Sequence, residues 1–306
     1  MARGGYARAM AEDWIRIASD TLSAEINPFG AELSSLRDAA GGELMTDADP
    51  AFWTGRAPLL FPIVGALNDG AYRVNGREYR LPKHGFARTL PFEPVVRDAD
   101  RAVFRLVDGP ETRPAFPFAF ILDIAFQVTG GDRPSLAVTA TVTNRGQEDM
   151  PASFGFHPAF AWPLPYGGQR ADHRIAFGQG DRGIPIRRVG TDGLIAPDPR
   201  PSPLAGDPPT LALHDDLFED DALIWPEIAS RSLRYGDGAH SLTVDFPDMP
   251  MLGIWTKPGA RYVCIEPWHG IADPEGFAGD IWEKPGILRF APGQSRSFAM
   301  GVTLRI

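Results

Sequence analysis

The chain has 306 residues, of which 43% are hydrophobic and 23% charged, a composition typical of an ordinary globular protein. Its net charge of -9 gives no general electrostatic attraction to nucleic acid or to an anionic membrane, so neither is expected as a partner. Cys264 is the only cysteine, which excludes an internal disulfide and favours a cytoplasmic location. No secretory signal is evident, and no stretch approaches the roughly 18 apolar residues of a membrane span.

The first strand signal is an alternation of apolar and polar residues over 22–26, as in a strand with one buried face. A hairpin follows, in which 72–74 is expected to face 79–81 across Asn75 and Gly76. This dipeptide tolerates the positive φ angles of a type I′ turn, so we predict a tight connection there.

A longer hairpin is predicted where the alternating run 118–128 turns at Gly130 and Gly131 and resumes over 136–142. Later strands are predicted at 242–246, 262–265 and 298–306. The last of them is expected to close a sheet.

The overall pattern is that of an all-β protein, because no amphipathic helical pattern exceeds about two turns. The 33 Gly and 30 Pro provide turns for many short strands, and we predict a large antiparallel β-sandwich. Residues 178–210 lack alternation and are expected to form a long irregular loop. Residues 1–12 are expected to be a flexible tail, and residues 13–306 a single domain.

His157 lies in the segment Phe154-Gly-Phe-His-Pro158, an apolar setting bounded by turn residues. Such surroundings favour the neutral imidazole, which could serve as a general acid or base. The alternative is a core histidine with satisfied hydrogen bonds, and this segment alone does not decide between them.

Glu266 follows a run of apolar strand residues and precedes Pro267, which is expected to end or bend the strand pairing. Burying an unpaired carboxylate is costly, so Glu266 should have a positive partner or a raised pKa that suits a general base. The alternative is a salt bridge at a strand end. Trp268 suits stacking on a sugar face or simple packing. Glu266 and His269 have a spacing that binds metal on helices, but the proline argues against a helix.

Two turns framed by Gly and Pro carry further polar side chains, namely Arg56 in 55–62 and His84 with Arg88 in 82–88. Arginine presents fixed donors to hydroxyl, carboxylate or phosphate oxygens, and turns of this kind often build sites. The alternative is that the arginines anchor loops at the surface.

The acidic stretch 214–224 is interpreted as a solvated loop, a metal site, or the start of a strand that carries one functional aspartate, Asp220 or Asp221. Cys264 is expected to be a buried, inert thiol. No Walker loop, dinucleotide fingerprint or zinc-type Cys/His spacing occurs, so neither a cofactor nor a metal is predicted.

Taken in order, these segments resemble the aldose 1-epimerase (galactose mutarotase) superfamily from about residue 14 to residue 306. The matching segments are Gly55 to Gly65, His84 to Arg88, Phe156 to Pro158, Asp221 to Ile224, and Cys264 to Trp268. They are similar to the branch of bacterial epimerase-like proteins and hexose-6-phosphate 1-epimerases. The resemblance implies a wide antiparallel sandwich, the galactose mutarotase-like supersandwich, with the sugar in an open cleft.

The resemblance also implies roles for individual residues. His157 would be the general acid and Glu266 the general base, and their mutual attraction would favour a protonated imidazole beside an ionised carboxylate. The residues that would bind sugar hydroxyls are Arg56, His84, Arg88 and Asp221, with Trp268 against the sugar face. The expected partner is an aldose or a sugar phosphate, and the expected assembly is a monomer or homodimer.

Two departures limit how far the resemblance reaches. The galactose-specific branch has an Asn-Arg pair after its arginine, where this chain has Ala57-Pro58-Leu59. The hexose-6-phosphate branch places its upstream arginine at a different offset from the proline than Arg56 has from Pro58. The sugar and its phosphorylation therefore stay open.

Two other functions compete with epimerisation. A glycoside hydrolase would use Glu266 together with Asp221, because that chemistry needs two carboxylates across a sugar site. A non-catalytic carbohydrate-binding protein is the other alternative, since a fold does not determine a function.

Overall fold

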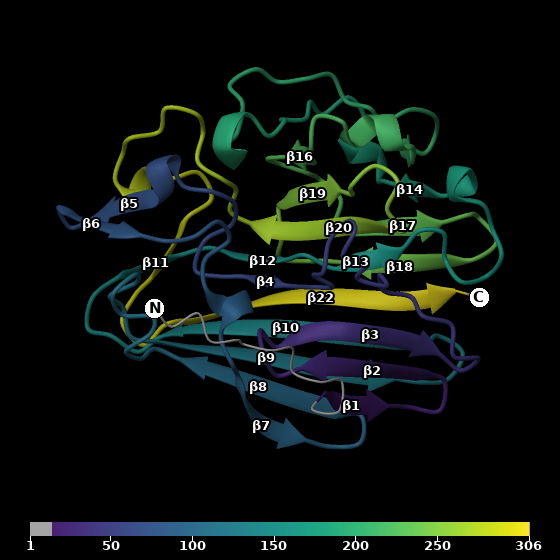
Figure 1. Cartoon of the computed structure of the whole chain (residues 1–306), viewed down its shortest axis with the longest axis horizontal. Helices are drawn as coiled ribbons and strands as arrows, with labels where there is room; N and C mark the ends of the chain where they lie inside the picture. The colour runs from purple at the N-terminus through teal and green to yellow at the C-terminus, as the bar shows by residue number, and fades with distance from the viewer. Residues whose placement is uncertain (1–13, 306) are drawn as a thin grey trace.

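The computed structural model describes residues 14–305, and in this part of the chain strands dominate (Figure 1). The predicted all-β fold is confirmed. The tail predicted at 1–12 lies outside the described residues, and the single domain stays a prediction. No helix among the described residues is long and apolar enough to cross a membrane.

One antiparallel sheet, here called the β22 sheet, contains both the long predicted hairpin and the C-terminal strand. Its strands, in spatial order, are β15 (Thr210–Ala212), β14 (Arg174–Ala176), β17 (Ser232–Gly236), β18 (Ser241–Asp245), β22 (Ser295–Arg305), β10 (Ser135–Asn144), β9 (Phe120–Thr129), β8 (Arg101–Val107) and β7 (Glu93–Arg97). The hairpin of β9 and β10 is confirmed, with Val128 opposite Leu136. The C-terminal strand β22 joins β18 to β10 within the sheet, not at its edge.

A second sheet, the β20 sheet, holds the segments that carry the predicted chemistry. Its strands are β16 (Leu223–Trp225), β19 (Met251–Trp255), β20 (Tyr262–His269), β12 (Phe154–Phe156) and β4 (Leu59–Leu60), and β13 (Ala159–Ala161) also pairs with β20.

The expectation that Pro267 ends or bends the pairing holds on one side of β20 only: pairing with β19 continues through it, with Leu252 opposite, whereas pairing with β12 and β13 is interrupted there. Ile265 donates its N–H to Pro158 O on the other side, at 3.2 Å. Alternate N–H groups of a strand point to the same side, so the nitrogen of Pro267 points to the same side as that of Ile265, toward β12 and β13. Proline has no N–H to donate, and the two strands are interrupted at this point.

The smaller sheets complete the strand set. They are β1 (Ile15–Ala18), β2 (Leu22–Asn27) and β3 (Glu32–Asp38); β5 (Ala71–Val74) and β6 (Arg77–Arg80); and β11 (Met150–Ala152) with β21 (Leu288–Phe290). The predicted hairpin at 72–81 is confirmed: Tyr72 lies opposite Tyr79, and Asn75 and Gly76 have φ angles of 52° and 72°.

Short 3-10 helices lie in the connections. They are η2 (Asn68–Gly70), η3 (Ala87–Thr89), η4 (Arg170–Asp172), η5 (Gln179–Asp181), η6 (Thr191–Gly193), η7 (Asp215–Phe218) and η8 (Ile281–Glu283). The irregular loop predicted at 178–210 is confirmed, because only η5, η6 and isolated bridges interrupt it between β14 and β15.

The sheets pack face to face through aromatic side chains, as expected for a sandwich. The rings of Phe154 in β12 and Phe298 in β22 are stacked with centroids 5.3 Å apart, which joins the β20 sheet to the β22 sheet. Phe61, after β4, contacts Phe120 of β9 edge to face at 5.1 Å. Pairs of this kind contribute about 0.5–1.5 kcal/mol beyond the burial of their area. The β20 sheet is thereby held in place beside the β22 sheet (Figure 1).

Candidate active site

The strand register places His157 opposite Glu266. Along β20, Gly155 of β12 lies opposite Trp268, and Ala159 of β13 lies opposite Cys264. The two pairings share one register, so the residue halfway between them, His157, faces Glu266. The imidazole Nε2 is 3.2 Å from the carboxylate Oε2, and the side chains are only 9% and 3% exposed. Two residues 109 positions apart in the sequence therefore form one buried acid/base pair.

Burial shifts the two pKa values in opposite directions. It lowers the pKa of His157 to about 3, with the positive charges of Arg88 and Lys83 adding to the effect. It raises the pKa of Glu266 well above its ordinary value, with the charge of Asp221 adding to the effect and that of Lys83 opposing it. Burial thus favours the neutral form of each group and opposes the mutual attraction that the resemblance implies for a charged pair. The pair as a unit then carries one proton over a wide range of pH.

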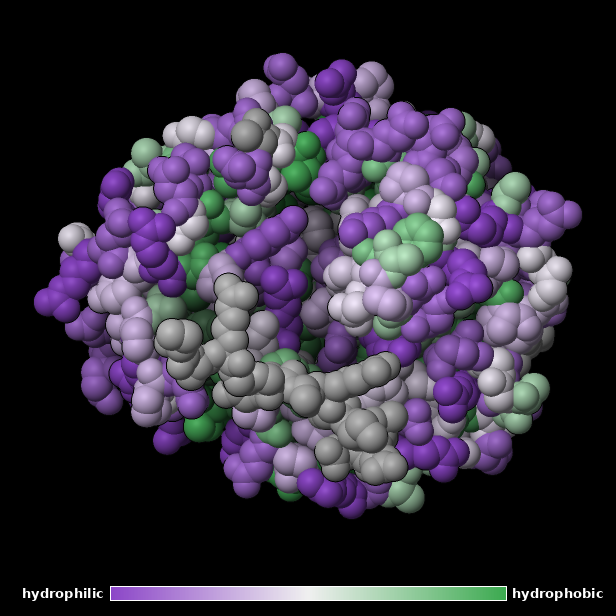
Figure 2. Space-filling model, in the orientation of Figure 1, coloured by the Kyte–Doolittle hydropathy of each residue, from purple (hydrophilic) through white to green (hydrophobic). Residues whose placement is uncertain are grey.

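The pair lies in the wall of a cavity of about 190 Å³, the central cavity. Figure 2 shows this face of the molecule hollowed near its centre, with hydrophilic residues around the hollow. The residues that line the cavity are Trp53, Val64, Gly65, Lys83, His84, Arg88, His157, Val189, Gly193, Asp221, Ala222, Ile224, Trp255, Glu266, Trp268 and Ala272. Segments far apart in the sequence, from Trp53 to Ala272, thus converge here, including the 178–210 loop through Val189 and Gly193.

His84 is held as a neutral hydrogen-bond donor. Its Nδ1 accepts the N–H of Gly65 at 3.0 Å, so the proton is on Nε2. Burial lowers its pKa well below the ordinary value, and its ring meets that of His157 edge to face at 6.0 Å. The backbone has a φ of 69°, and Gly85 follows with a φ of 70°. A left-handed backbone conformation costs free energy at residues other than glycine, and such residues are concentrated at functional sites.

Two cationic side chains line the cavity beside His84. Arg88 donates from Nη2 to the carbonyl of Lys83 at 2.9 Å, and its buried Nε has no hydrogen-bond partner within residues 14–305. Burial lowers the pKa of Arg88, and the charge of Glu32 opposes this shift. Lys83 was not singled out from the sequence, although it lies in the same 82–88 turn as the residues that were.

Of the two adjacent aspartates, Asp221 lines the cavity and Asp220 does not. Asp221 has a φ of 66°, and its Oδ1 accepts the N–H of Ala222 at 2.7 Å. Arg188 donates to its carbonyl oxygen at 3.2 Å. The structure therefore brings Asp221 to the site, as the family pattern implied.

Trp268 lies across two glycines on the cavity side of the sheet. A Cβ added at Gly155 would lie 2.7 Å from Cδ1 of the indole, and one at Gly253 would also collide with the ring. The indole therefore requires glycine at both positions. Its buried Nε1 meets no acceptor among the described residues at full hydrogen-bond geometry, but it interacts with the Glu266 carboxyl and lowers the pKa of that group.

Trp53 and Trp255 flank His157, and sequence reasoning missed both. The centroid of Trp53 is 5.0 Å from that of His157 with the planes inclined at 31°, and Trp255 meets the imidazole edge to face at 5.9 Å. Aromatic rings of this kind exclude water and offer apolar faces to a sugar. Nothing in the segments around either tryptophan distinguishes it from a packing residue.

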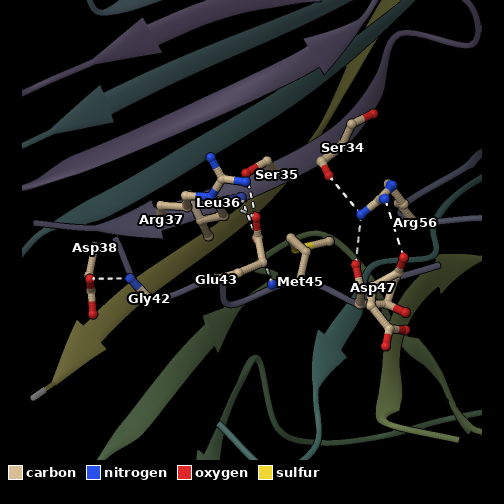
Figure 3. Close-up of polar contacts among 11 residues, drawn as sticks. Ser34, Ser35, Leu36, Arg37, Asp38, Gly42, Glu43, Met45, Asp47 and Arg56 are labelled. Carbon is tan, nitrogen blue, oxygen red and sulfur yellow. Dashed lines mark hydrogen bonds and ion pairs between the residues drawn. The ribbon is translucent and has the colours of Figure 1, made fainter. Parts of the chain in front are cut away.

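Arg56 does not line the cavity. Figure 3 shows its guanidinium turned toward backbone carbonyls: Nη1 donates to Thr46 O at 2.7 Å and to Ser34 O at 3.2 Å, and Nη2 donates to Asp47 O at 3.4 Å. The arginine thus ties the segment 43–56, which carries Trp53, to strand β3. This position fits the loop-anchoring alternative and not the expected contact with a sugar.

Glu43 makes a second attachment of the same segment. Its Oε1 accepts the N–H groups of Leu36 at 2.9 Å and of Met45 at 3.0 Å, as Figure 3 also shows. Hydrogen bonds of a carboxylate to backbone N–H groups are strong because the acceptor is charged. Trp53 is therefore carried on a segment that is fixed at both ends.

Cys264 and His269 are neighbours of Glu266 on β20 with different surroundings. Cys264 is fully buried, and burial raises the pKa of its thiol well above the ordinary value, so it is not a nucleophile at neutral pH. His269 is three residues from Glu266 and thus on the opposite face of the strand, where its ring meets Phe298. The Glu-x-x-His spacing therefore forms no shared site.

Comparison with known proteins agrees with this architecture. The chain matches the family model of aldose 1-epimerase over residues 13–286. Chromosomal protein LacX of Lactococcus lactis subsp. lactis is 28% identical over 299 residues, covering 95% of this chain and 99% of that protein. The structure of a galactose mutarotase related enzyme from Lactobacillus acidophilus superposes with a TM-score of 0.85 at 31% identity, covering 96% of this chain and 97% of that one.

A galactose mutarotase-like protein from Lactobacillus casei ATCC 334 gives a TM-score of 0.86 at 30% identity, covering 95% of this chain and 100% of that one. The chain therefore belongs to the aldose 1-epimerase family, and its sheets form a galactose mutarotase-like fold.

Proposed function

We propose that this chain is a cofactor-independent aldose 1-epimerase that interconverts the α and β anomers of an aldose, with Glu266 and His157 as the acid/base pair. The observation that carries the proposal is the 3.2 Å contact between His157 Nε2 and Glu266 Oε2 in the wall of the central cavity. Anomerisation needs one group to take a proton from the anomeric hydroxyl and another to give one to the ring oxygen. Both oxygens are bonded to C1, so the two catalytic groups must be neighbours.

The proposed mechanism moves one proton through the pair. Glu266 removes the proton of the anomeric hydroxyl while His157 protonates the ring oxygen, and the ring opens to the aldehyde. Rotation about the bond to C1 exposes the other carbonyl face, and the reverse transfers close the ring. Each positioned transfer typically contributes about 10² to 10⁴-fold in rate.

The protonation state of the resting pair suits this sequence. For catalysis the shared proton must be on His157 while Glu266 is ionised. The neutral pair reaches this state when the proton moves from Glu266 to His157 across their 3.2 Å contact. The positive charge of Lys83 favours the carboxylate form of Glu266. The pair is reset when the proton returns, so no cofactor would be consumed.

The remaining polar groups of the cavity are proposed to hold the sugar. His84 presents an Nε2–H donor, and Arg88 has a donor without a partner among residues 14–305. The Trp268 N–H lies beside the Glu266 carboxyl. Asp221 adds a carboxylate acceptor. The indole faces of Trp53 and Trp255 would pack against the C–H groups of the ring.

A hexose 6-phosphate is the second candidate substrate. Lys83 and Arg88 both line the central cavity, and an arginine and a lysine together are a common phosphate-binding pair. This observation favours a sugar phosphate over a neutral sugar only if the phosphate reaches both side chains.

The direct test is anomer exchange by NMR on glucose, galactose and glucose 6-phosphate, with polarimetry of freshly dissolved α-anomers. Acceleration by the protein supports the proposal, and the ranking of the sugars assigns the substrate. Release of an aryl leaving group from an aryl glycoside would instead indicate a hydrolase that uses Glu266 and Asp221. Saturable sugar binding without turnover would indicate a carbohydrate-binding protein.

A further inference from the structure

Three side chains with different donor atoms meet beneath the central cavity. A ring nitrogen of His157, the Sγ of Cys264 and a carboxylate oxygen of Glu266 all lie within 4.8 Å of one another, and all three residues are buried. The proposed epimerase chemistry uses the His157 nitrogen and the Glu266 oxygen only as proton carriers, and it leaves the Cys264 sulfur without a role. The cluster is therefore larger than the proposed reaction requires.

The strand register generates this cluster. Cys264 and Glu266 are two residues apart on β20 and so project from the same face. His157 faces Glu266 from the break between β12 and β13, which completes a triangle of donors from two neighbouring strands. Because the triangle is part of a paired sheet, its donors are preorganised and not drawn from mobile loops.

The donor set is the one that zinc prefers. Zn²⁺ is bound by Cys sulfur, His nitrogen and Asp or Glu oxygen at about 2.0 to 2.3 Å, which places the ligand atoms of a tetrahedral site about 3.5 Å apart. The His157 and Glu266 atoms are already 3.2 Å apart. The sulfur lies within 4.8 Å of both atoms, so it has to approach each of them by at most about 1.3 Å to reach this spacing.

The surroundings set the coordination and the charge. His157 and Glu266 line the cavity whereas Cys264 does not, so three protein ligands would leave a fourth position on the cavity side. Asp221 also lines the cavity and favours a cation there, while Lys83 and Arg88 oppose it. These opposing charges predict moderate and reversible binding, not a permanent structural metal.

We propose that His157, Cys264 and Glu266 form an inhibitory binding site for Zn²⁺ or a similar soft divalent metal ion. The inhibition rests on the proposed epimerase function, because an ion on Nε2 and the carboxylate occupies the lone pairs that move the proton. Metal binding itself does not depend on that function.

Cobalt titration of the full chain, followed by absorption spectroscopy, tests the site without any sugar. Bound Co²⁺ should give a near-ultraviolet thiolate charge-transfer band, which can only come from Cys264 because it is the sole cysteine. The band should disappear in Cys264→Ala, and in Cys264→Ser if the alanine variant folds poorly. His269→Gln is the matched control, since this histidine is on the opposite face of β20, and it should keep the band.

Zinc inhibition tests the second half of the proposal. Zn²⁺ should slow anomer exchange by the wild type, a chelator should reverse the effect, and Cys264→Ala should need at least about tenfold more metal for the same inhibition. The absence of a thiolate band in the wild type overturns the site, and equal zinc sensitivity in the Cys264 variants overturns the inhibition. A thiolate band in a protein that turns over no sugar supports the metal site and contradicts only the proposed epimerase function.

Discussion

His157 faces Glu266 across two adjacent strands, with 3.2 Å between Nε2 and Oε2 and both side chains nearly inaccessible to solvent. The two prolines that follow these residues, Pro158 and Pro267, lie at the point where the pairing of β20 with β12 and β13 is interrupted. The sheet thus provides a rigid frame for the pair, and both side chains line the central cavity. Precise placement of this kind is what proton transfer to a bound substrate requires.

The pH dependence of turnover should lack the usual histidine step. Burial lowers the pKa of His157 to about 3 and raises that of Glu266, so the pair keeps its single proton through the region around 6.5. We expect kcat/KM to be flat between about pH 5 and about pH 7 after subtraction of the uncatalysed rate. A titration step near pH 6.5 in NMR exchange data would contradict the assigned environment of the imidazole.

Glu266→Gln should make the thermal stability less dependent on pH. The folded pKa of Glu266 is raised, so its contribution to stability is present below the ordinary value of 4.5 and is lost as pH rises through the folded pKa. A glutamine cannot ionise and escapes this loss. The free energy of unfolding of the variant relative to the wild type should therefore increase from about pH 5 to about pH 8, by up to about 1.4 kcal/mol per pH unit, and the difference in Tm should grow with it.

The control for that measurement is Glu93→Gln, since Glu93 is an exposed strand residue of β7. This variant controls for the loss of one carboxylate at an exposed position. A Tm difference for Glu266→Gln that does not grow with pH relative to this control would show that Glu266 is not held in its neutral form.

Gly155→Ala should displace Trp268. The added Cβ would lie 2.7 Å from the indole, so the ring must move away from the cavity wall. We expect kcat/KM to fall by about ten- to a hundredfold, because misplacements of about 1 Å have effects of this size. Gly109→Ala is the matched control, as its Cβ would meet no atom within 4 Å. Similar kinetics for the two variants would show that the position of Trp268 is unimportant.

Replacing Arg56 should affect stability, whereas replacing Arg88 should affect substrate binding. Arg56→Gln removes donors from the carbonyls of Ser34, Thr46 and Asp47, and should lower the free energy of unfolding by about 1–3 kcal/mol in urea. Arg88→Gln removes a cation from the cavity and should chiefly raise KM. A large rise in KM for Arg56→Gln with unchanged stability would show that Arg56 contacts the sugar after all.

Much of the fold followed from periodicity alone. Alternating residues predicted β2, β9, β10 and β18, and Asn75-Gly76 predicted a hairpin turn, because side-chain period and turn chemistry are local properties. The pairing of β22 between β10 and β18 joins distant segments, which periodicity does not encode. The sequence also did not show on which side of β20 Pro267 interrupts the pairing, because this depends on which neighbouring strand lies on the side where proline lacks an N–H.

The site was predicted in part. The resemblance singled out His84, Arg88, His157, Asp221 and Glu266, which the structure brings to one cavity. Arg56 was placed wrongly beside them because its partners are backbone carbonyls, which leave no signature in a sequence. The sequence did not single out Lys83, Trp53 or Trp255, because most lysines are simply exposed and most tryptophans simply pack in the interior.

The most direct test of the proposed function is anomer exchange by NMR on glucose, galactose and glucose 6-phosphate, comparing the wild type with Glu266→Gln at equal concentration. We predict acceleration on at least one sugar by the wild type, and a loss of about 10² to 10⁴-fold in the variant with its fold intact by circular dichroism. Undiminished exchange in Glu266→Gln, or no acceleration of any of the three sugars by the wild type, would contradict the proposed epimerase mechanism.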